Sequence, residues 1–214
     1  NANELVRAES EDNGKPEWLA KTVDIPRCSA NIRFFATSIL HFESKSHNMD
    51  GDAINYTIKQ PIGVAGCISP WNLPLYLLTW KIAPAIAAGN TVVAKPSEIT
   101  PFTAYLFSKI CKDISFPSGV INIVHGEGGV VGDSIVKKSD VISFTGGTET
   151  GRLVAVEAAK NFKKCSLELG GKNPTVVFAD ANFDVAIKNS VKSAFLNQGQ
   201  ICLCGSRIFV EDSI

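Results

Sequence analysis

The stretch Ile62–Ser69, IGVAGCIS, opens a series of short apolar runs that decides the fold. Three more runs follow, at Thr91–Lys95, Val120–Val124 and Val141–Phe144, each with the length of a buried strand. The intervals between them have the length and composition of helices. Alternating strands and helices predict an α/β fold, Rossmann-like, with helices on both faces of a parallel sheet and ligands at the carboxyl ends of the strands.

Helices are expected between and after these strands, at Leu75–Ala88, Pro101–Lys112, Gly129–Lys137 and Thr148–Ala159. Pro101 follows Thr100, as a proline in the first helical turn follows its cap. The ends of the chain predict further elements: a largely helical Glu17–His47 in which Pro26 starts or kinks a helix, a half-exposed strand in Ala53–Gln60, a helix over Asn182–Asn197 and a strand over Ser206–Val210.

The composition excludes several kinds of partner. With 21 acidic and 21 basic residues the chain has no basic stripe, which disfavours nucleic acid and anionic membrane surfaces. Its most apolar stretch, Leu73–Ala94, is interrupted by Lys81 and Pro84, so it predicts a buried helix and strand rather than a membrane span. The six scattered cysteines lack disulfide or zinc-site spacing, which favours reduced thiols, a cytoplasmic setting and no metal.

Glu168 and Cys202 are candidates for a base and a nucleophile. A cysteine thiolate attacks carbonyl carbon, and a carboxylate can take a proton from the thiol or from water. Glu168 lies between two leucines and before Gly170, which predicts a partly buried strand end beside a cleft. Cys204 is the rival nucleophile, and a buried inert thiol is the ordinary fate of a lone cysteine.

Two glycine-rich turns are candidates for holding a dinucleotide. The turn at Gly126 lacks the last glycine of the G-x-G-x-x-G fingerprint, since Val131 occupies that position, and a packing turn is the alternative. The turn Phe144–Gly151 follows a strand and precedes a helix, so its amides could meet a pyrophosphate. Lys95 and Glu98 could bond a ribose, and a carboxylate there repels a 2′-phosphate, which favours NAD over NADP. Their alternative is a solvated turn.

Five ordered motifs resemble those of the aldehyde dehydrogenase family: ISPWNLP at Ile68–Pro74, KPSE at Lys95–Glu98, FTGGTETG at Phe144–Gly151, LELGGK at Leu167–Lys172 and NQGQIC at Asn197–Cys202. The resemblance implies that Cys202 is the nucleophile, that Glu168 is the general base and that Asn72, with the Cys202 amide, stabilises the oxyanion. It implies that aldehyde becomes acid through a cysteine thiohemiacetal and a thioester, with NAD as cofactor. The implied cofactor contacts are Ser69, Trp71, Lys95, Ser97, Glu98, Gly126, Gly146, Gly147, Gly151 and Leu169, although Gly147 replaces the family's more common serine.

Arg27 is the candidate for substrate recognition. The run Asp24–Arg27 with Asn31–Ala36 resembles family members that oxidise semialdehydes carrying a carboxylate. This likeness implies that Arg27 meets the substrate carboxylate with two hydrogen bonds. A solvated helical arginine is the alternative.

The resemblance also implies a domain organisation. Residues 1–52 form the N-terminal helical part of the cofactor domain, 53–61 a strand of an oligomerisation arm, 62–170 the NAD-binding domain and 171–214 the start of a second α/β catalytic domain. Family chains are more than twice this length, so we expect an internal fragment of a homo-oligomeric enzyme, a dimer or tetramer.

Three other functions are alternatives to aldehyde oxidation. The first is a catalytically incomplete fragment that retains nucleotide binding or subunit contacts. Transfer of the thioester to coenzyme A is disfavoured because Glu168 supplies a base for hydrolysis. A cysteine protease is disfavoured because no local signature accompanies His41, His47 or His125.

Overall fold

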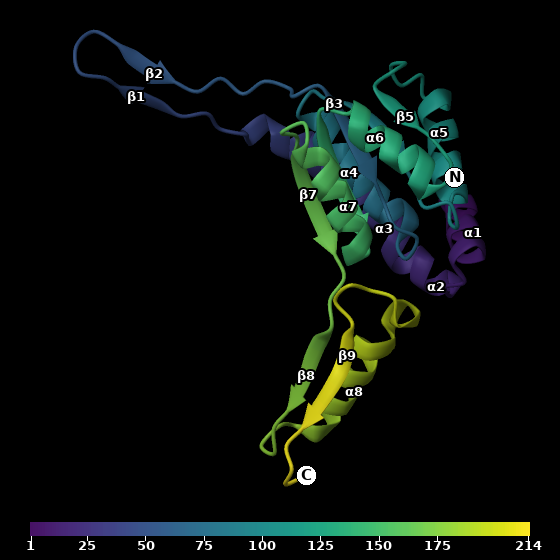
Figure 1. Cartoon of the computed structure of the whole chain (residues 1–214). Helices are drawn as coiled ribbons and strands as arrows, with labels where there is room; N and C mark the ends of the chain where they lie inside the picture. Colours follow the sequence, from purple (N-terminus) through teal and green to yellow (C-terminus); the bar gives the residue numbers. More distant parts are fainter.

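Five parallel strands form the central sheet in the order β5-β4-β3-β6-β7, in a computed structural model that describes residues 1–214 (Figure 1). They are β3 Val64–Ile68, β4 Thr91–Lys95, β5 Ile121–Ile123, β6 Val141–Gly146 and β7 Lys164–Leu169. The chain adds strands on one side of β3 and then on the other. The carboxyl ends of β3 and β6 therefore form the switch point at which such sheets bind ligands.

Helices cover both faces of this sheet, as the sequence predicts (Figure 1). Helices α4 (Pro74–Ala87) and α5 (Phe102–Asp113) share one hydrophobic core with Ala65 and Cys67 of β3. Helices α6 (Asp133–Lys138) and α7 (Thr148–Ala159) share the other core with Ile68. Successive side chains of a strand point to opposite faces, so β3 contributes to both cores.

Gly66 allows α6 to approach β3 closely. A Cβ atom at this position would lie 2.6 Å from Ile135 Cγ2 and 2.7 Å from Ser139 Oγ. Any larger residue would push helix and strand apart. This glycine therefore keeps α6 tightly packed against β3.

The amino-terminal helices form an outer layer over α4 and α5. They are α1 (Ala2–Asn13), α2 (Glu17–Leu19), the π-turn η1 (Ala20–Asp24), α3 (Ile25–Ser38) and the 3₁₀ turn η2 (Ile39–His41). Pro26 lies in the first turn of α3, as expected. The wider π-turn precedes it, where the missing proline amide would interrupt an α-helix.

The helical prediction for Glu17–His47 is wrong after His41. The chain leaves the body there, and β1 (Ser46–Asn48) pairs antiparallel with β2 (Ile54–Tyr56) in a hairpin that extends away from the sheet (Figure 1). The strand expected within Ala53–Gln60 is present but shorter. Its partner β1 falls inside the range assigned to the helical part. The sequence does not predict this strand, because its polar residues show no alternation and become a strand only by pairing with β2.

A separate two-stranded sheet follows the central one. Strands β8 (Asn173–Val177) and β9 (Gly205–Val210) pair in parallel. They are connected by α8 (Phe183–Phe195) and the turn η4 (Leu196–Gly199). Asn182 caps α8 through its side chain, at the predicted start of this helix. None of the helices combines the length and the apolar character that crossing a membrane requires.

Candidate functional site

A cleft of about 940 Å³ opens at the carboxyl ends of β3, β4 and β6. Seven predicted cofactor residues lie in its wall, namely Ser69, Trp71, Lys95, Ser97, Glu98, Gly146 and Gly147. Most of the remaining wall comes from the segment Glu127–Val136, which includes the start of α6, and from the whole length of α7. The topology of the sheet thus brings together three motifs that are far apart in the sequence.

Lys95 and Glu98 form an ion pair at the end of β4. Lys95 Nζ lies 2.8 Å from Glu98 Oε2 and 3.1 Å from the carbonyl oxygen of Pro96. The Lys95 side chain is only 3% exposed, whereas that of Glu98 is 48% exposed. The hydrogen bond from Lys95 holds the pKa of Glu98 below its ordinary value, so the carboxyl is charged at neutral pH. The burial of Lys95 argues against a simply solvated turn.

The cleft has open space and free hydrogen-bonding capacity for a dinucleotide. Ser69 Oγ is buried and has no hydrogen-bond partner within the chain. A Cβ atom added to Gly129 or Gly147 would meet nothing within 4 Å. Helix α7 begins just after Gly147, so its first backbone amides face this space and favour an anion such as a pyrophosphate. The residues present therefore fit such a ligand.

Three predicted cofactor residues lie outside the cleft wall. Gly126 has φ +143°, and a Cβ there would lie 2.5 Å from Val131 Cγ2, which favours the packing-turn alternative. Gly151 and Leu169 pack against each other, because a Cβ on Gly151 would lie 2.5 Å from Leu169 Cδ2. Their observed contacts join α7 to β7.

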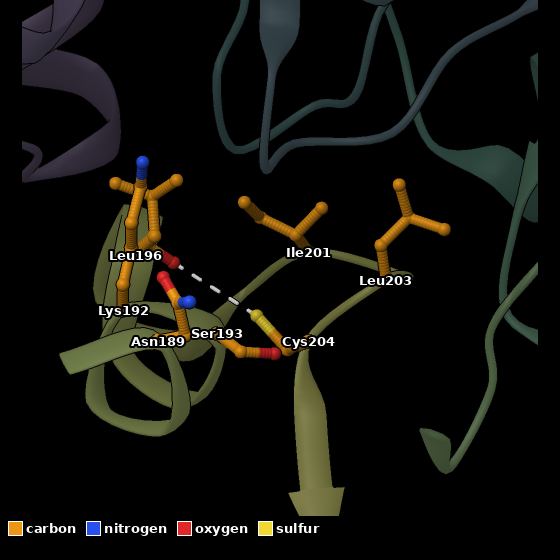
Figure 2. Close-up of a pocket in the computed structure, with 7 residues that line it drawn as sticks. All are labelled: Asn189, Lys192, Ser193, Leu196, Ile201, Leu203 and Cys204. Atoms are coloured by element: carbon orange, nitrogen blue, oxygen red, sulfur yellow. Dashed lines mark hydrogen bonds between the residues drawn. The ribbon is translucent and has the colours of Figure 1, made fainter. Parts of the chain in front are cut away.

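Cys202 is exposed in the turn before β9, whereas Cys204 is buried. Figure 2 shows Cys204 in a small pocket of about 290 Å³, with its Sγ turned towards the carbonyl oxygen of Leu196 at 3.9 Å. The pocket also contains Ile201, Leu203 and residues of α8. An incoming electrophile can reach Cys202 more readily than Cys204, so the geometry favours Cys202 as nucleophile.

Asn72 lies beside the cysteine loop. Its side-chain Nδ2 donates to the backbone carbonyl oxygen of Gln200 at 2.7 Å. The backbone carbonyl oxygen of Asn72 accepts from Asn197 Nδ2 at 2.9 Å. The loop that follows β3 is therefore joined to the segment that immediately precedes Cys202.

The Cys202 turn is also tied to the segment after β7. Asn173 Nδ2 donates to the carbonyl oxygen of Cys202 at 2.7 Å, and a Cβ on Gly171 would lie 3.4 Å from the same oxygen. Asn173 was not singled out from the sequence, where an asparagine next to a glycine pair has no distinctive pattern. The segment after Glu168 thus lies in contact with the cysteine loop.

Glu168 lies near the end of β7, opposite Thr145 of β6, but it is exposed. The expectation of partial burial is wrong for this chain. Strand β7 forms the edge of the sheet, and α7 packs on the face that carries Leu167 and Leu169. Glu168 points to the other face, which that helix does not cover.

Lys81 is a candidate site residue that the sequence motifs do not identify. This α4 residue is only 5% exposed, and its Nζ donates to Thr145 Oγ1 at 2.6 Å and to Ser143 Oγ at 3.3 Å. Burial lowers the pKa of Lys81 to about 8, against the raising influence of Cys67 and Glu168. The available signal was a single lysine within the apolar stretch Leu73–Ala94.

Arg27 lies on the exposed face of α3, with its guanidinium carbon 5.8 Å from the centre of the Tyr76 ring. It forms no salt bridge with an acidic residue. Its charge is therefore available to an external anion.

Nowhere do three His, Cys, Asp or Glu side chains gather in a way that could hold a metal ion.

Residues 1–214 match the model of the aldehyde dehydrogenase family, and the chain belongs to this family. Within it, the chain is 57% identical to 2-aminomuconic semialdehyde dehydrogenase of Danio rerio and 55% identical to the protein of that name from Homo sapiens. Each match covers 99% of this chain and 44% of the relative, so the chain spans less than half the length of these proteins.

The fold agrees with that of solved family members. The NAD+ complex of an aldehyde dehydrogenase from Bacillus cereus matches with a TM-score of 0.96 and 38% identity, over 99% of this chain and 44% of that one. The family resemblance and the predicted α/β fold with a parallel sheet are thus confirmed.

Proposed function

We propose that the whole protein oxidises an aldehyde to a carboxylic acid, with NAD as the cofactor and Cys202 as the nucleophile. The observation that carries this proposal is the exposed Cys202 turn, tied through Gln200 to Asn72. The cleft contains the buried Ser69 hydroxyl, which has no partner within the chain, and the Lys95–Glu98 ion pair. Ser69 belongs to the same loop as Asn72. Family membership and the relatives' names support the same reaction.

In this proposal the cleft holds NAD, which supplies the hydride acceptor when bound. Lys95 and Glu98 would bond the hydroxyls of the adenosine ribose, and the amides that begin α7 would meet the pyrophosphate. The Glu98 carboxylate repels a 2′-phosphate, which favours NAD over NADP. The NAD complexes of two structural neighbours support NAD as a ligand of this cleft.

The chain's own residues would divide the chemistry as follows. Cys202 Sγ attacks the aldehyde carbon to form a thiohemiacetal, whose oxyanion needs donors placed in advance. The Asn72 amide and the Cys202 backbone N–H are the candidate donors. Asn72 would then exchange its present partner, the Gln200 carbonyl, for the oxyanion.

Glu168 would act in the second half of the reaction. It takes a proton from water, which hydrolyses the thioester and releases the acid. Its exposure in this chain leaves it accessible to water. Lys81, whose pKa the Glu168 carboxylate raises against the larger effect of burial, donates to Thr145, which lies opposite Glu168 in the sheet.

For the substrate we propose a semialdehyde that carries a carboxylate. The names of the relatives support this class, and so does the exposed Arg27 guanidinium, which has no acidic partner. A guanidinium can hold a carboxylate with two parallel hydrogen bonds. Arg27→Lys should therefore raise KM for an anionic semialdehyde more than for a neutral aldehyde of similar length.

The decisive experiment measures NADH formation from a panel of aldehydes. Cys202→Ser in the whole protein should abolish turnover, while the neighbouring Cys204→Ser should keep most of it because Cys204 is a packing residue. Turnover that survives in Cys202→Ser would refute the assignment of the nucleophile.

A second candidate function is nucleotide binding without turnover by the 214-residue chain alone. The cleft described above is lined by residues between Ile68 and Lys160, all within this chain. Calorimetric titration with NAD tests this directly. Binding without NADH formation supports it, and the absence of binding contradicts it.

A further inference from the structure

Three charged side chains are fully buried beneath the outer helices. Lys15, Glu9 and Asp24 are each 0% exposed, and Lys15 Nζ lies 2.8 Å from Asp24 Oδ2 and 3.7 Å from Glu9 Oε1. Removing such charges from water is costly, and an apolar replacement is often as stable. Stability alone is therefore a weak explanation for this cluster.

The ammonium group of Lys15 has one further contact. It donates to the carbonyl oxygen of Asn72 at 3.2 Å. Two residues earlier, Asn13 Nδ2 donates to the carbonyl oxygen of Trp71 at 2.7 Å. The connection between α1 and α2 thus holds the backbone of the loop that carries the candidate oxyanion donor.

The same Asn72 carbonyl oxygen supports the turn before Cys202. It accepts from Asn197 Nδ2, the first of three successive residues with left-handed backbone, Asn197 (φ 52°), Gln198 (φ 57°) and Gly199 (φ 71°). Non-glycine residues rarely adopt this conformation, and it persists only where surrounding contacts enforce it.

Other contacts to this turn come from the same two segments. Asn72 Nδ2 bonds the Gln200 carbonyl, and Gln198 Nε2 donates to the Asn13 carbonyl at 3.2 Å. The turn is therefore enforced by the Asn72 loop and by the segment that carries Lys15.

We propose that Lys15 is a positioning residue: held by Asp24 and Glu9, its ammonium group fixes the Asn72 carbonyl and, through it, the left-handed turn that presents Cys202. The inference rests on the proposed function of Asn72 and Cys202. Lys15 itself is fully buried and acts through Asn72.

A matched pair of variants separates positioning from stability. In Asp24→Asn, Glu9 remains as a counter-ion and Lys15 keeps its bond to Asn72. In Lys15→Met/Asp24→Asn, the methionine fills the space of the lysine stem and both charges are removed. Burial raises the pKa of Glu9 to about 7; the double variant removes the lowering influence of Lys15 and the smaller raising influence of Asp24, so it favours a neutral Glu9.

The first readout is amide hydrogen exchange of residues 197–204 in the chain, with the thermal midpoint measured alongside. We expect exchange roughly tenfold faster in Lys15→Met/Asp24→Asn than in Asp24→Asn, because only the double variant removes the bond from Lys15 to the Asn72 carbonyl. Equal exchange rates in the two variants would overturn the proposal.

Steady-state kinetics of the whole protein provide the second readout. We expect kcat to fall roughly tenfold in the double variant relative to Asp24→Asn, with KM for the aldehyde within about twofold, because misplacement affects the reacting atoms more than binding. Equal kcat values would overturn the proposal. Turnover by Cys202→Ser would instead refute the underlying function, and the exchange comparison would still test Lys15.

A third variant covers failure of the double variant to fold. Lys15→Gln/Asp24→Asn is neutral but keeps an amide donor near the Asn72 carbonyl. Exchange of residues 197–204 that is faster than in Asp24→Asn, but slower than in an unfolded peptide of the same sequence, supports positioning. Exchange equal to that of Asp24→Asn, with kcat unchanged, argues against a role for the ammonium group.

Discussion

The side-chain amide of Asn72 donates a 2.7 Å hydrogen bond to the carbonyl oxygen of Gln200. This bond joins the loop after the first strand of the central sheet to the segment that immediately precedes Cys202. A candidate oxyanion donor and a candidate nucleophile, distant in sequence, are thereby brought to one place. The relationship makes the roles of both loops testable by substitution.

Replacing Asn72 should impair chemistry more than binding. In Asn72→Ala the oxyanion loses one donor and the cysteine loop loses its bond at Gln200, so we expect kcat for aldehyde oxidation to fall about 10²- to 10³-fold. Steady-state kinetics of the whole protein measure this. Asn55→Ala, which truncates an exposed asparagine of the strand Ile54–Tyr56 outside the cleft wall, is the control and should change kcat by less than about threefold. Similar losses in both variants would contradict the oxyanion role.

Glu98→Gln should weaken NAD binding and relax the discrimination against NADP. The variant replaces a charge-assisted acceptor and removes the repulsion of a 2′-phosphate, so we expect the Kd for NAD to rise roughly tenfold. Calorimetric titration with both nucleotides measures this. Glu149→Gln removes an exposed carboxylate outside the cleft wall and should leave both affinities unchanged.

The pH dependence of NAD binding should follow the Glu98 carboxyl. Because Lys95 lowers its pKa in the folded protein, the interaction is fully present above the ordinary carboxyl pKa and is lost as pH falls through the lowered value. We therefore expect NAD affinity to decline in acid for the wild type and to be flatter for Glu98→Gln. Parallel profiles for the two proteins would assign the decline to another group.

Lys81 should make stability rise with pH between about 8 and 10.5. Its pKa is lowered to about 8 from 10.5, so the unfolded chain binds more protons than the folded chain in this window, and unfolding becomes less favourable as pH increases. Urea unfolding of wild type and Lys81→Met, both with reductant, measures the effect. Their difference in unfolding free energy should change by about 3 kcal/mol across the window. A constant difference would contradict the buried, poorly solvated lysine.

Gly66→Ala should destabilise the fold without touching the cleft. The added Cβ would lie 2.6 Å from Ile135 Cγ2, and overpacking of this kind costs about 1–3 kcal/mol. Urea unfolding measures the loss. Gly129→Ala adds the same atom where nothing lies within 4 Å and should change stability by less than about 0.5 kcal/mol. Equal effects would show that helix packing at Gly66 is not the cause.

The sequence predicted the central elements well where the signal was local. The strand Thr91–Lys95 and the helix Thr148–Ala159 have the predicted bounds, because an apolar run of strand length and a helix-period pattern each report the face that an element buries. The strand Ser46–Asn48 was missed, because its polar residues become a strand only by pairing with Ile54–Tyr56. Glu168 was expected to be partly buried, but its strand lies at the sheet edge, and strand order is not written in local spacing.

By itself the sequence determined the alternation of strands and helices, the family motifs and the candidate cysteines. Only the tertiary structure decided that Cys204 is buried and Cys202 exposed, that Gly126 meets Val131, and that Lys15 reaches the Asn72 carbonyl. The physical reason is the range of the interactions involved. Hydrophobic periodicity acts within one element, whereas exposure and hydrogen bonding at the site depend on segments that meet only after the sheet and its crossovers have formed.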